Sequence, residues 1–140
     1  MNPIVLASGS PRRKQLLEML RIPFRVIPPD VDEHVLPGEQ PDAYVTRLSR
    51  AKAEAVVPRA RGDVILAADT TVVLDGAIFE KPTSPAHAVE MLSRLQGHTH
   101  EVMTAVAVAR DQEVEHALDV SRVTFRPADR ATLEAYVSTG

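Results

Sequence analysis

The chain has 140 residues, of which 44% are hydrophobic and 25% charged, so it can form one domain with a sizeable core and does not resemble a disordered protein. It contains no cysteine, which excludes disulfide bonds and thiolate metal sites, and its net charge of -3 argues against general binding to nucleic acid polymers. No apolar run approaches the length of a membrane span, and the start lacks the basic segment of a signal peptide, so we expect a cytoplasmic protein without a membrane partner.

A strand, a turn and a helix are predicted at the beginning of the chain. Residues 3–7 form an apolar run that is typical of a buried strand, and the turn residues 8–10 follow it. Pro11 suits the first position of a helix, which must end before Pro23. The side chains expected to face the core from this helix are Leu16, Leu17, Met19 and Leu20.

A second strand, an acidic loop and a long helix are predicted next. Residues 24–27 read as a short strand that ends at two prolines, and residues 30–40 are rich in acidic side chains. Pro41 then begins an amphipathic helix that ends near Pro58. Its apolar face is expected to contain Tyr44, Val45, Leu48, Ala51, Ala55 and Val56.

The middle of the chain predicts a buried strand followed by a hairpin. Residues 64–68 are a continuous apolar run, and Asp69 is expected at the end of that strand. A second apolar run, residues 72–74, leads into the strong turn signal Asp75-Gly76. Residues 77–79 are expected to form the returning strand of the hairpin.

The last part of the chain predicts a helix, two strands and a final helix. Ser84-Pro85 should begin a helix that Gly97 terminates, with Ala88, Met91, Leu92 and Leu95 on its core side. Strands are expected over residues 100–109 and 114–125 around the turn 110–112, and a helix over residues 128–137.

A site for phosphate is suggested by the turn from the first strand into the first helix. Ser8, Gly9 and Ser10 precede a helix N-terminus whose free N–H groups lie beside Arg12 and Arg13, and such a place attracts anions. The spacing is neither that of a P-loop nor that of a dinucleotide fingerprint. A capped, solvent-exposed basic helix start explains the local pattern equally well.

Asp69 is a candidate metal ligand or general base, because it is expected at a strand end, where open α/β sheets bind their ligands. A carboxylate there can bind Mg²⁺ or take a proton from an attacking water. The more common structural explanation of an isolated Asp is a turn or a cap. Glu33, Lys52 and Lys81 gain meaning only together with Asp69, because a lone surface Lys or Glu is usually a solvated charge.

The five histidines give no support for a zinc site. His98 and His100 lie two residues apart on an expected strand and could share a face, but two ligands are too few for zinc. His34, His87 and His116 lie among polar residues and are expected at the surface.

Several separate motifs, in matching order and spacing, closely resemble the Maf family of nucleoside triphosphate pyrophosphatases. The likeness covers essentially the whole chain. The residues that carry it are Leu6-Ala7-Ser8-Gly9-Ser10-Pro11-Arg12-Arg13, Ala68-Asp69-Thr70, Leu74-Asp75-Gly76, Glu80-Lys81-Pro82, Gly97-His98, Val102-Met103-Thr104-Ala105-Val106 and Tyr136-Val137-Ser138-Thr139-Gly140.

The resemblance implies one α/β domain over residues 1–140, with a mixed β-sheet flanked by helices and a substrate cleft. It implies hydrolysis of a nucleoside triphosphate at the α-phosphate with Mg²⁺ or Mn²⁺, and it suggests a homodimer. It also implies a role for each of the following residues: Ser8, Arg12 and Arg13 in a phosphate-binding turn, Glu33 and Asp69 in an acidic metal and water site with Asp69 as the base, and Lys52 and Lys81 in a cationic clamp.

The dipeptide Asp69-Thr70 resembles the branch of the family that acts on dTTP and UTP, rather than the branch that prefers 7-methyl-GTP, and Arg12 would share that specificity role. Modified pyrimidine triphosphates would also be substrates. Family members usually continue beyond Gly140 into a segment with a base-contacting Gln, so we expect this chain to be a shortened form. The alternative function is a nucleotide-binding regulator of cell division and septum formation that has weak or no catalysis.

Overall fold

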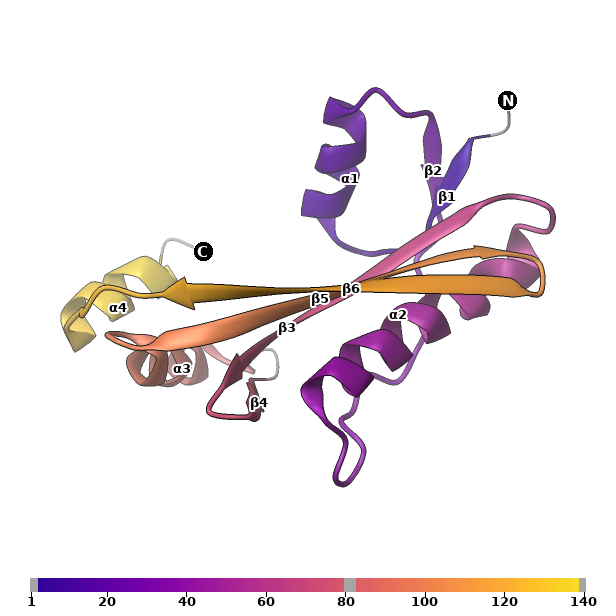
Figure 1. Cartoon of the computed structure of the whole chain (residues 1–140). Helices are drawn as coiled ribbons and strands as arrows, with labels where there is room; N and C mark the ends of the chain where they lie inside the picture. Colours follow the sequence, from indigo (N-terminus) through magenta and orange to yellow (C-terminus); the bar gives the residue numbers. More distant parts are fainter. Residues whose placement is uncertain (1–2, 80–82, 139–140) are drawn as a thin grey trace. The chain divides into compact units, whose positions relative to one another are not determined.

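The computed structural model describes residues 3–79 and 83–138, and Figure 1 shows the order of its helices and strands. The elements are β1 (Ile4–Leu6), α1 (Pro11–Met19), β2 (Phe24–Val26), α2 (Pro41–Val56), a 3₁₀ turn η1 (Val57–Arg59), β3 (Ile65–Leu74), β4 (Ala77–Phe79), α3 (Pro85–Leu95), β5 (Thr99–Arg110), β6 (Glu113–Thr124) and α4 (Arg130–Ser138). The mixed sheet flanked by helices confirms the predicted α/β class.

The chain forms two compact units. Unit 1 comprises Met1–Thr70 and Thr104–Asp119, and unit 2 comprises Thr71–Met103 and Val120–Gly140. Strands β3, β5 and β6 contribute residues to both units. Among the described residues, no helix is both long enough and apolar enough to span a membrane.

In unit 1, the strands follow the order β2-β1-β3-β5-β6. Strand β1 lies parallel to both of its neighbours, and its pairing with β3 places Val5 opposite Ile65 and Leu6 opposite Leu66. Short apolar strands of this kind are buried because helices cover the faces of a parallel sheet. The core between the sheet and α2 consists of Val5, Ala7, Ala53, Val56, Ala60, Ile65, Ala67, Ala107 and Ala109.

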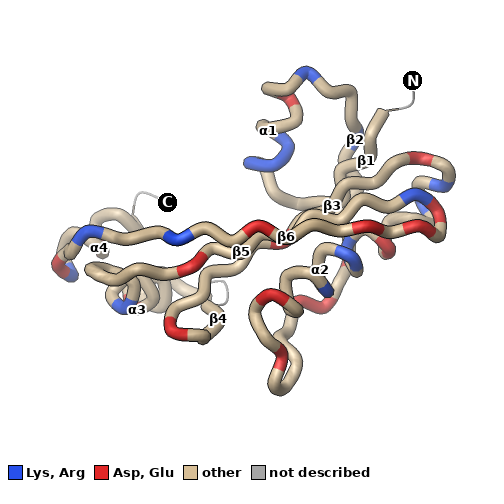
Figure 2. The backbone as a smooth tube through the Cα atoms, viewed as in Figure 1, with Lys and Arg blue, Asp and Glu red and all other residues tan. Residues whose placement is uncertain are grey.

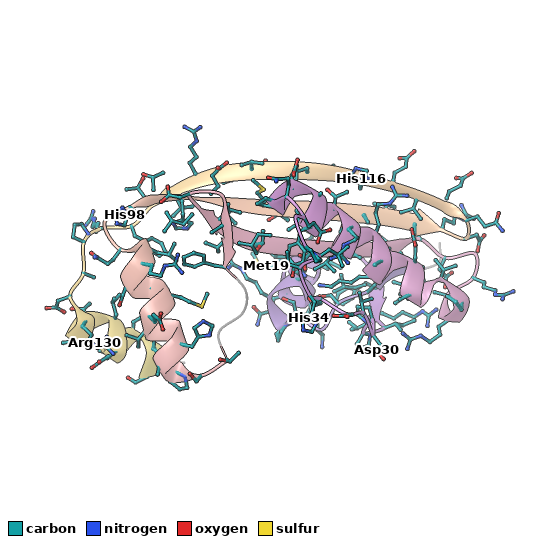
Figure 3. The ribbon with its side chains drawn as sticks, turned by 90° about the horizontal axis from the view of Figure 1, so that it is seen from below. Met19, Asp30, His34, His98, His116 and Arg130 are labelled. Atoms are coloured by element: carbon teal, nitrogen blue, oxygen red, sulfur yellow. The ribbon has the colours of Figure 1, made fainter. Side chains whose placement is uncertain are left out.

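Helix α1 begins as predicted but does not bury the predicted face. Ser10 caps it, with its hydroxyl accepting from the backbone N–H of Arg13, and Pro11 occupies the first turn. Only Leu17 is buried, whereas Leu16, Met19 and Leu20 are 51%, 78% and 67% exposed, so the expected core contact of these three is wrong. Met19, labelled in Figure 3, lies in the last turn of the helix. The four apolar residues are spread around a wide part of the helix surface, and the rest of unit 1 covers only the part that carries Leu17.

Helix α2 confirms its predicted amphipathic face. Tyr44, Val45, Leu48 and Val56 are buried, and Ala51 and Ala55 are half-buried. The apolar positions recur every three or four residues, which keeps them on one side of the helix, although the polar residue Ser49 is buried there too.

Strand β3 does not end where the sequence suggested. The strand continues from Ile65 through Asp69 to Leu74, so the expected position of Asp69 at a strand end is wrong. The residues after Asp69, Thr70-Thr71-Val72-Val73, are all β-branched, and such side chains favour continued extended backbone. Asp69 therefore lies in the middle of a long strand.

In unit 2, β3 and β4 form the predicted hairpin. Asp75 and Gly76 have φ angles of 50° and 79°, as a two-residue turn between twisted strands requires. Leu74, Phe79 and Leu95 form a small core, with Met91 packed against it. Helix α3, capped by Ser84, packs against α4.

The two neighbouring histidines of unit 2 do not share a strand face. His98 precedes β5 and is exposed, whereas His100 lies within β5 and is only 4% exposed. The ring of His100 packs edge-on against Phe125, with the ring centroids 4.8 Å apart. The expectation of a shared face is wrong because the strand begins one residue after His98.

Candidate functional site

Three charged side chains of unit 1 meet at the centre of β3. Lys52 extends from α2, and its Nζ lies 2.8 Å from Asp69 Oδ1 and 3.0 Å from Glu33 Oε1. The side chains of Lys52 and Asp69 are only 12% and 10% exposed, whereas that of Glu33 is 43% exposed. We call Asp69, Lys52 and Glu33 the acid–lysine cluster. It is a nearly buried ion pair with a second carboxylate at its solvent side.

The loop over residues 30–40 (loop 30–40), which carries Glu33, is bonded to α2. The hydroxyl of Tyr44 donates to the carbonyl of Glu33 at 2.6 Å. Arg47 binds the carboxylate of Glu39 through Nε at 2.7 Å and Nη2 at 2.9 Å, and its Nη2 also donates to the carbonyl of His34 at 3.0 Å. Figure 3 labels Asp30 and His34 in this loop. Two side chains of α2 thus hold the loop in a defined path.

These contacts shift the pKa values of the groups involved. The hydrogen bonds from Arg47 hold the pKa of Glu39 below its ordinary value, and the same contact raises the pKa of Arg47. The pKa of Asp32 is likewise lowered, chiefly because the side chain and backbone of His34 bond to it. The contacts of Asp32 and Glu39 therefore favour their ionised forms.

Replacing Glu39 with Gln should lower the free energy of unfolding at neutral pH and change it much less in acid. The folded-state pKa of Glu39 lies below its unfolded value, so the contact with Arg47 contributes stability above the unfolded pKa of about 4.5. That contribution is lost as the pH falls through the lower folded-state pKa. The difference between wild type and variant in denaturant titrations should shrink on acidification. A difference that grows in acid would contradict this role of Glu39.

A second cluster joins the first helix to β3. The Nη1 of Arg13 donates to the carbonyl of Ala68 at 2.9 Å, and its Nη2 donates to the hydroxyl of Thr70 at 3.3 Å. The hydroxyls of Thr70 and Thr104 lie 3.0 Å apart. We call Arg13, Thr70 and Thr104 the arginine–threonine cluster. The backbone of Ala7 bonds to the carbonyl of Leu66, so Arg13 bonds to the next carbonyl on the same side of β3, where β1 has left the sheet.

The turn before α1 is formed by its own hydroxyl groups. Ser8 is buried, and its hydroxyl accepts from the backbone N–H of Ser10 at 3.0 Å. Arg12 is exposed in the first turn of the helix. Figure 2 shows the basic start of α1 in blue and the acidic loop before α2 in red.

The two clusters lie on opposite faces of β3. Successive side chains of a strand alternate, and the exposure along β3 follows this rule, with Asp69 buried toward α2 and Thr70 exposed. Figure 1 shows α1 and α2 on opposite sides of the unit 1 sheet. The structure thus brings together Glu33, Lys52 and Asp69, and separately Arg13 and Thr70. Lys81 lies outside the described residues.

The carboxylates of Glu33 and Asp69 supply the oxygen ligands that Mg²⁺ and Mn²⁺ prefer. Within residues 3–79 and 83–138, no group of three or more His, Asp or Glu side chains is placed to hold a metal ion. Mg²⁺ is, however, commonly bound through one or two carboxylates together with substrate phosphates. Glu33 and Asp69 are therefore of the ligand type that such a shared metal uses, and both carboxylates bond to Lys52 in this structure.

Sequence reasoning missed the residues that hold loop 30–40, namely Tyr44, Arg47 and Glu39. Tyr44 was predicted only as a core side chain, although its hydroxyl needs a partner when the ring is buried. Arg47 lies three residues further along α2, and Glu39 precedes the helix. The sequence did carry a signal for these contacts. A Tyr and an Arg three residues apart follow an acidic loop, and residues at this spacing are neighbours on a helix surface.

The whole described chain resembles known proteins. A family model described as "Maf-like protein" matches residues 3–140. The chain is 45% identical over 141 residues to the dTTP/UTP pyrophosphatase of Pectobacterium atrosepticum and 44% identical over 140 residues to that of Symbiobacterium thermophilum. In both comparisons the match covers 100% of this chain and 72% of the relative.

Two solved structures share the fold. Protein VC0702 from Vibrio cholerae matches with a TM-score of 0.50 and 13% identity, covering 99% of this chain and 77% of that protein. The Staphylococcus aureus Ham1 protein matches with a TM-score of 0.54 and 17% identity, covering 86% of this chain and 70% of that protein. At these identities the likeness supports the α/β architecture alone.

Proposed function

This chain belongs to the Maf family of nucleoside triphosphate pyrophosphatases, and on that premise we propose that it hydrolyses dTTP and UTP to the monophosphate and pyrophosphate. The observation that carries the proposal is the acid–lysine cluster, in which Lys52 holds a nearly buried Asp69 in the middle of β3. The names of the relatives support the choice of pyrimidine substrates.

In the proposed reaction, Asp69 takes a proton from the water that attacks the α-phosphorus. The bond between the α-phosphorus and the bridging oxygen breaks, and pyrophosphate leaves. Lys52 fixes the orientation of the Asp69 carboxylate through its 2.8 Å contact, which keeps a general base in a productive position. A base fixed in this way needs little reorganisation when the proton is transferred.

The cations of the chain would bind the triphosphate. We assign Arg12 and Lys81 to the phosphates, because positive side chains stabilise the charge that develops on a pyrophosphate leaving group. Ser8 shapes the turn that presents the N-terminus of α1, where backbone N–H groups favour anions. Arg13, which follows the phosphate-binding turn, bonds to Ala68 and Thr70 on either side of Asp69 and would hold β3 in place there.

Glu33 and Asp69 would hold a divalent cation, Mg²⁺ or Mn²⁺. When bound, this cation supplies positive charge that offsets the repulsion between the nucleophile and the polyphosphate. Glu33 suits this part because its side chain is the most exposed of the acid–lysine cluster.

The test is pyrophosphate release from a panel of nucleoside triphosphates with Mg²⁺ or Mn²⁺. We expect dTTP and UTP to give the highest kcat/KM, and purine triphosphates, including 7-methyl-GTP, to be poor substrates. Comparable kcat/KM for all nucleotides would refute the pyrimidine preference but leave the hydrolysis itself intact. No release from any triphosphate with either metal would refute the proposed activity of this chain.

A further inference from the structure

We propose that Tyr44 and Arg47 are positioning residues, which hold loop 30–40 against α2 so that the carboxylate of Glu33 stays in the acid–lysine cluster. The inference rests on the proposed function. It assigns a role to Tyr44 and Arg47, which the proposed function does not use. Both side chains bond to loop 30–40, and their effect on the site passes through that loop.

The two residues bind the backbone at Glu33 and at the residue after it. Tyr44 bonds to the backbone carbonyl of Glu33 itself at 2.6 Å, and Arg47 bonds to the carbonyl of the next residue, His34, at 3.0 Å. Two consecutive carbonyls are therefore fixed by side chains of the same helix. With the backbone held at this point, the Glu33 side chain has only its own torsions left to order.

Arg47 also fixes the far end of the loop. Its fork binds both carboxylate oxygens of Glu39, whose side chain is 8% exposed, and Glu39 Oε1 accepts from the backbone N–H of Leu36 at 3.1 Å. A bidentate contact of this type constrains direction as well as distance. Arg47 thus binds the loop at both His34 and Glu39, and Tyr44 binds it at Glu33.

Helix α2 orders the three contacts in space. Tyr44 and Arg47 lie at positions i and i+3, which are neighbours on one face of a helix, and Lys52 extends from the same helix further along. The same helix therefore positions both loop 30–40 and the ammonium group of Lys52. Glu33 reaches Lys52 at 3.0 Å because both ends of that contact are tied to α2.

The geometry explains why Glu33 needs such help. Its side chain is 43% exposed, and it lies in a loop with no regular secondary structure. An exposed ion pair contributes little by itself, because solvent screens it and both side chains lose conformational entropy. Contacts from Tyr44 and Arg47 supply the order that the Glu33–Lys52 pair cannot provide alone.

The experiment compares Tyr44→Phe and Arg47→Met with wild type, each alone and combined with Glu33→Gln. We expect each single variant to lower kcat for dTTP about three- to tenfold, as for the loss of one or two hydrogen bonds, with a smaller change in KM. In the Glu33→Gln background the same substitutions should change kcat less than twofold, because residues that act through Glu33 have nothing left to position.

Two further measurements do not depend on catalysis. Amide hydrogen exchange of the peptide that covers loop 30–40 should accelerate in both variants, and the affinity for Mn²⁺ in the presence of a non-hydrolysable nucleotide should fall. Arg25→Met is the matched control, because it breaks another arginine–carboxylate pair of unit 1, Arg25–Asp63, at 3.1 Å. We expect the control to leave kcat, Mn²⁺ affinity and exchange of loop 30–40 unchanged.

Unchanged exchange of loop 30–40 in Tyr44→Phe and Arg47→Met would overturn the proposal. So would an equal loss of kcat with and without the Glu33 carboxylate, since that outcome indicates a general structural effect. If the wild-type chain releases no pyrophosphate, the proposed function fails, and exchange together with Mn²⁺ affinity still decides whether Tyr44 and Arg47 position Glu33.

Discussion

Replacing Asp69 with Asn should abolish nearly all release of pyrophosphate, with kcat falling by about 10²- to 10⁴-fold, the range expected for loss of a general base. The amide is the same size as the carboxylate but cannot accept the proton of the attacking water. Lys52 keeps Glu33 as a partner at 3.0 Å, so we expect the variant to fold and to bind nucleotide nearly as well as wild type. Steady-state kinetics and equilibrium nucleotide binding provide the measurement.

The matched control for this variant is Asp75→Asn. Asp75 lies in the exposed turn between β3 and β4 at a φ angle of 50°, a conformation that Asn adopts readily. The control makes the same chemical change on the same stretch of chain, and its kcat should match that of wild type. Equal turnover by Asp69→Asn and wild type would remove Asp69 from the reaction.

Replacing Lys52 with Met should destabilise the fold and abolish activity together. The substitution leaves Asp69, 10% exposed, without its ammonium partner and next to the carboxylate of Glu33. Removing one member of a buried ion pair costs about 3–5 kcal/mol, and we expect about 3 kcal/mol here because Glu33 is partly exposed. Denaturant unfolding measures this loss in the free energy of unfolding.

Two comparisons test the cause of that loss. Lys14→Met removes an exposed lysine of α1, and we expect its free energy of unfolding to stay within about 0.5 kcal/mol of wild type. The double variant Lys52→Met/Asp69→Asn should be more stable than Lys52→Met, because the nearly buried charge is gone. If the double variant is less stable than Lys52→Met, the loss does not come from an unpaired carboxylate.

Local signals in the chain predicted most elements correctly. Pro11 and Pro41 begin helices, the pair Asp75-Gly76 forms the hairpin turn, and the apolar run 64–68 lies in β3 from Ile65 onward. These features depend on backbone torsions and on periodicity over a few residues, so neighbours in sequence suffice to specify them. Motif likeness likewise identified the family from residues along the whole chain.

The errors concern the burial of helix α1 and the length of strand β3. The apolar residues Leu16, Met19 and Leu20 predicted a core contact, but unit 1 covers only the Leu17 position of α1. The apolar run before Asp69 predicted a strand end, but the β-branched residues beyond it extend β3. The first error came from tertiary burial, and the second from giving too little weight to the β-branched residues that follow Asp69.

The sequence by itself determined the order of the elements, the class of fold, the family and the residue types of the site. Only the tertiary structure decided which of those residues meet. It placed Asp69 and Thr70 on opposite faces of β3, brought Lys52 from α2 to Asp69, and tied loop 30–40 to Tyr44 and Arg47. The physical reason is that a charged contact requires approach within about 4 Å between segments far apart in sequence, and the packing of helices on the sheet alone fixes such distances.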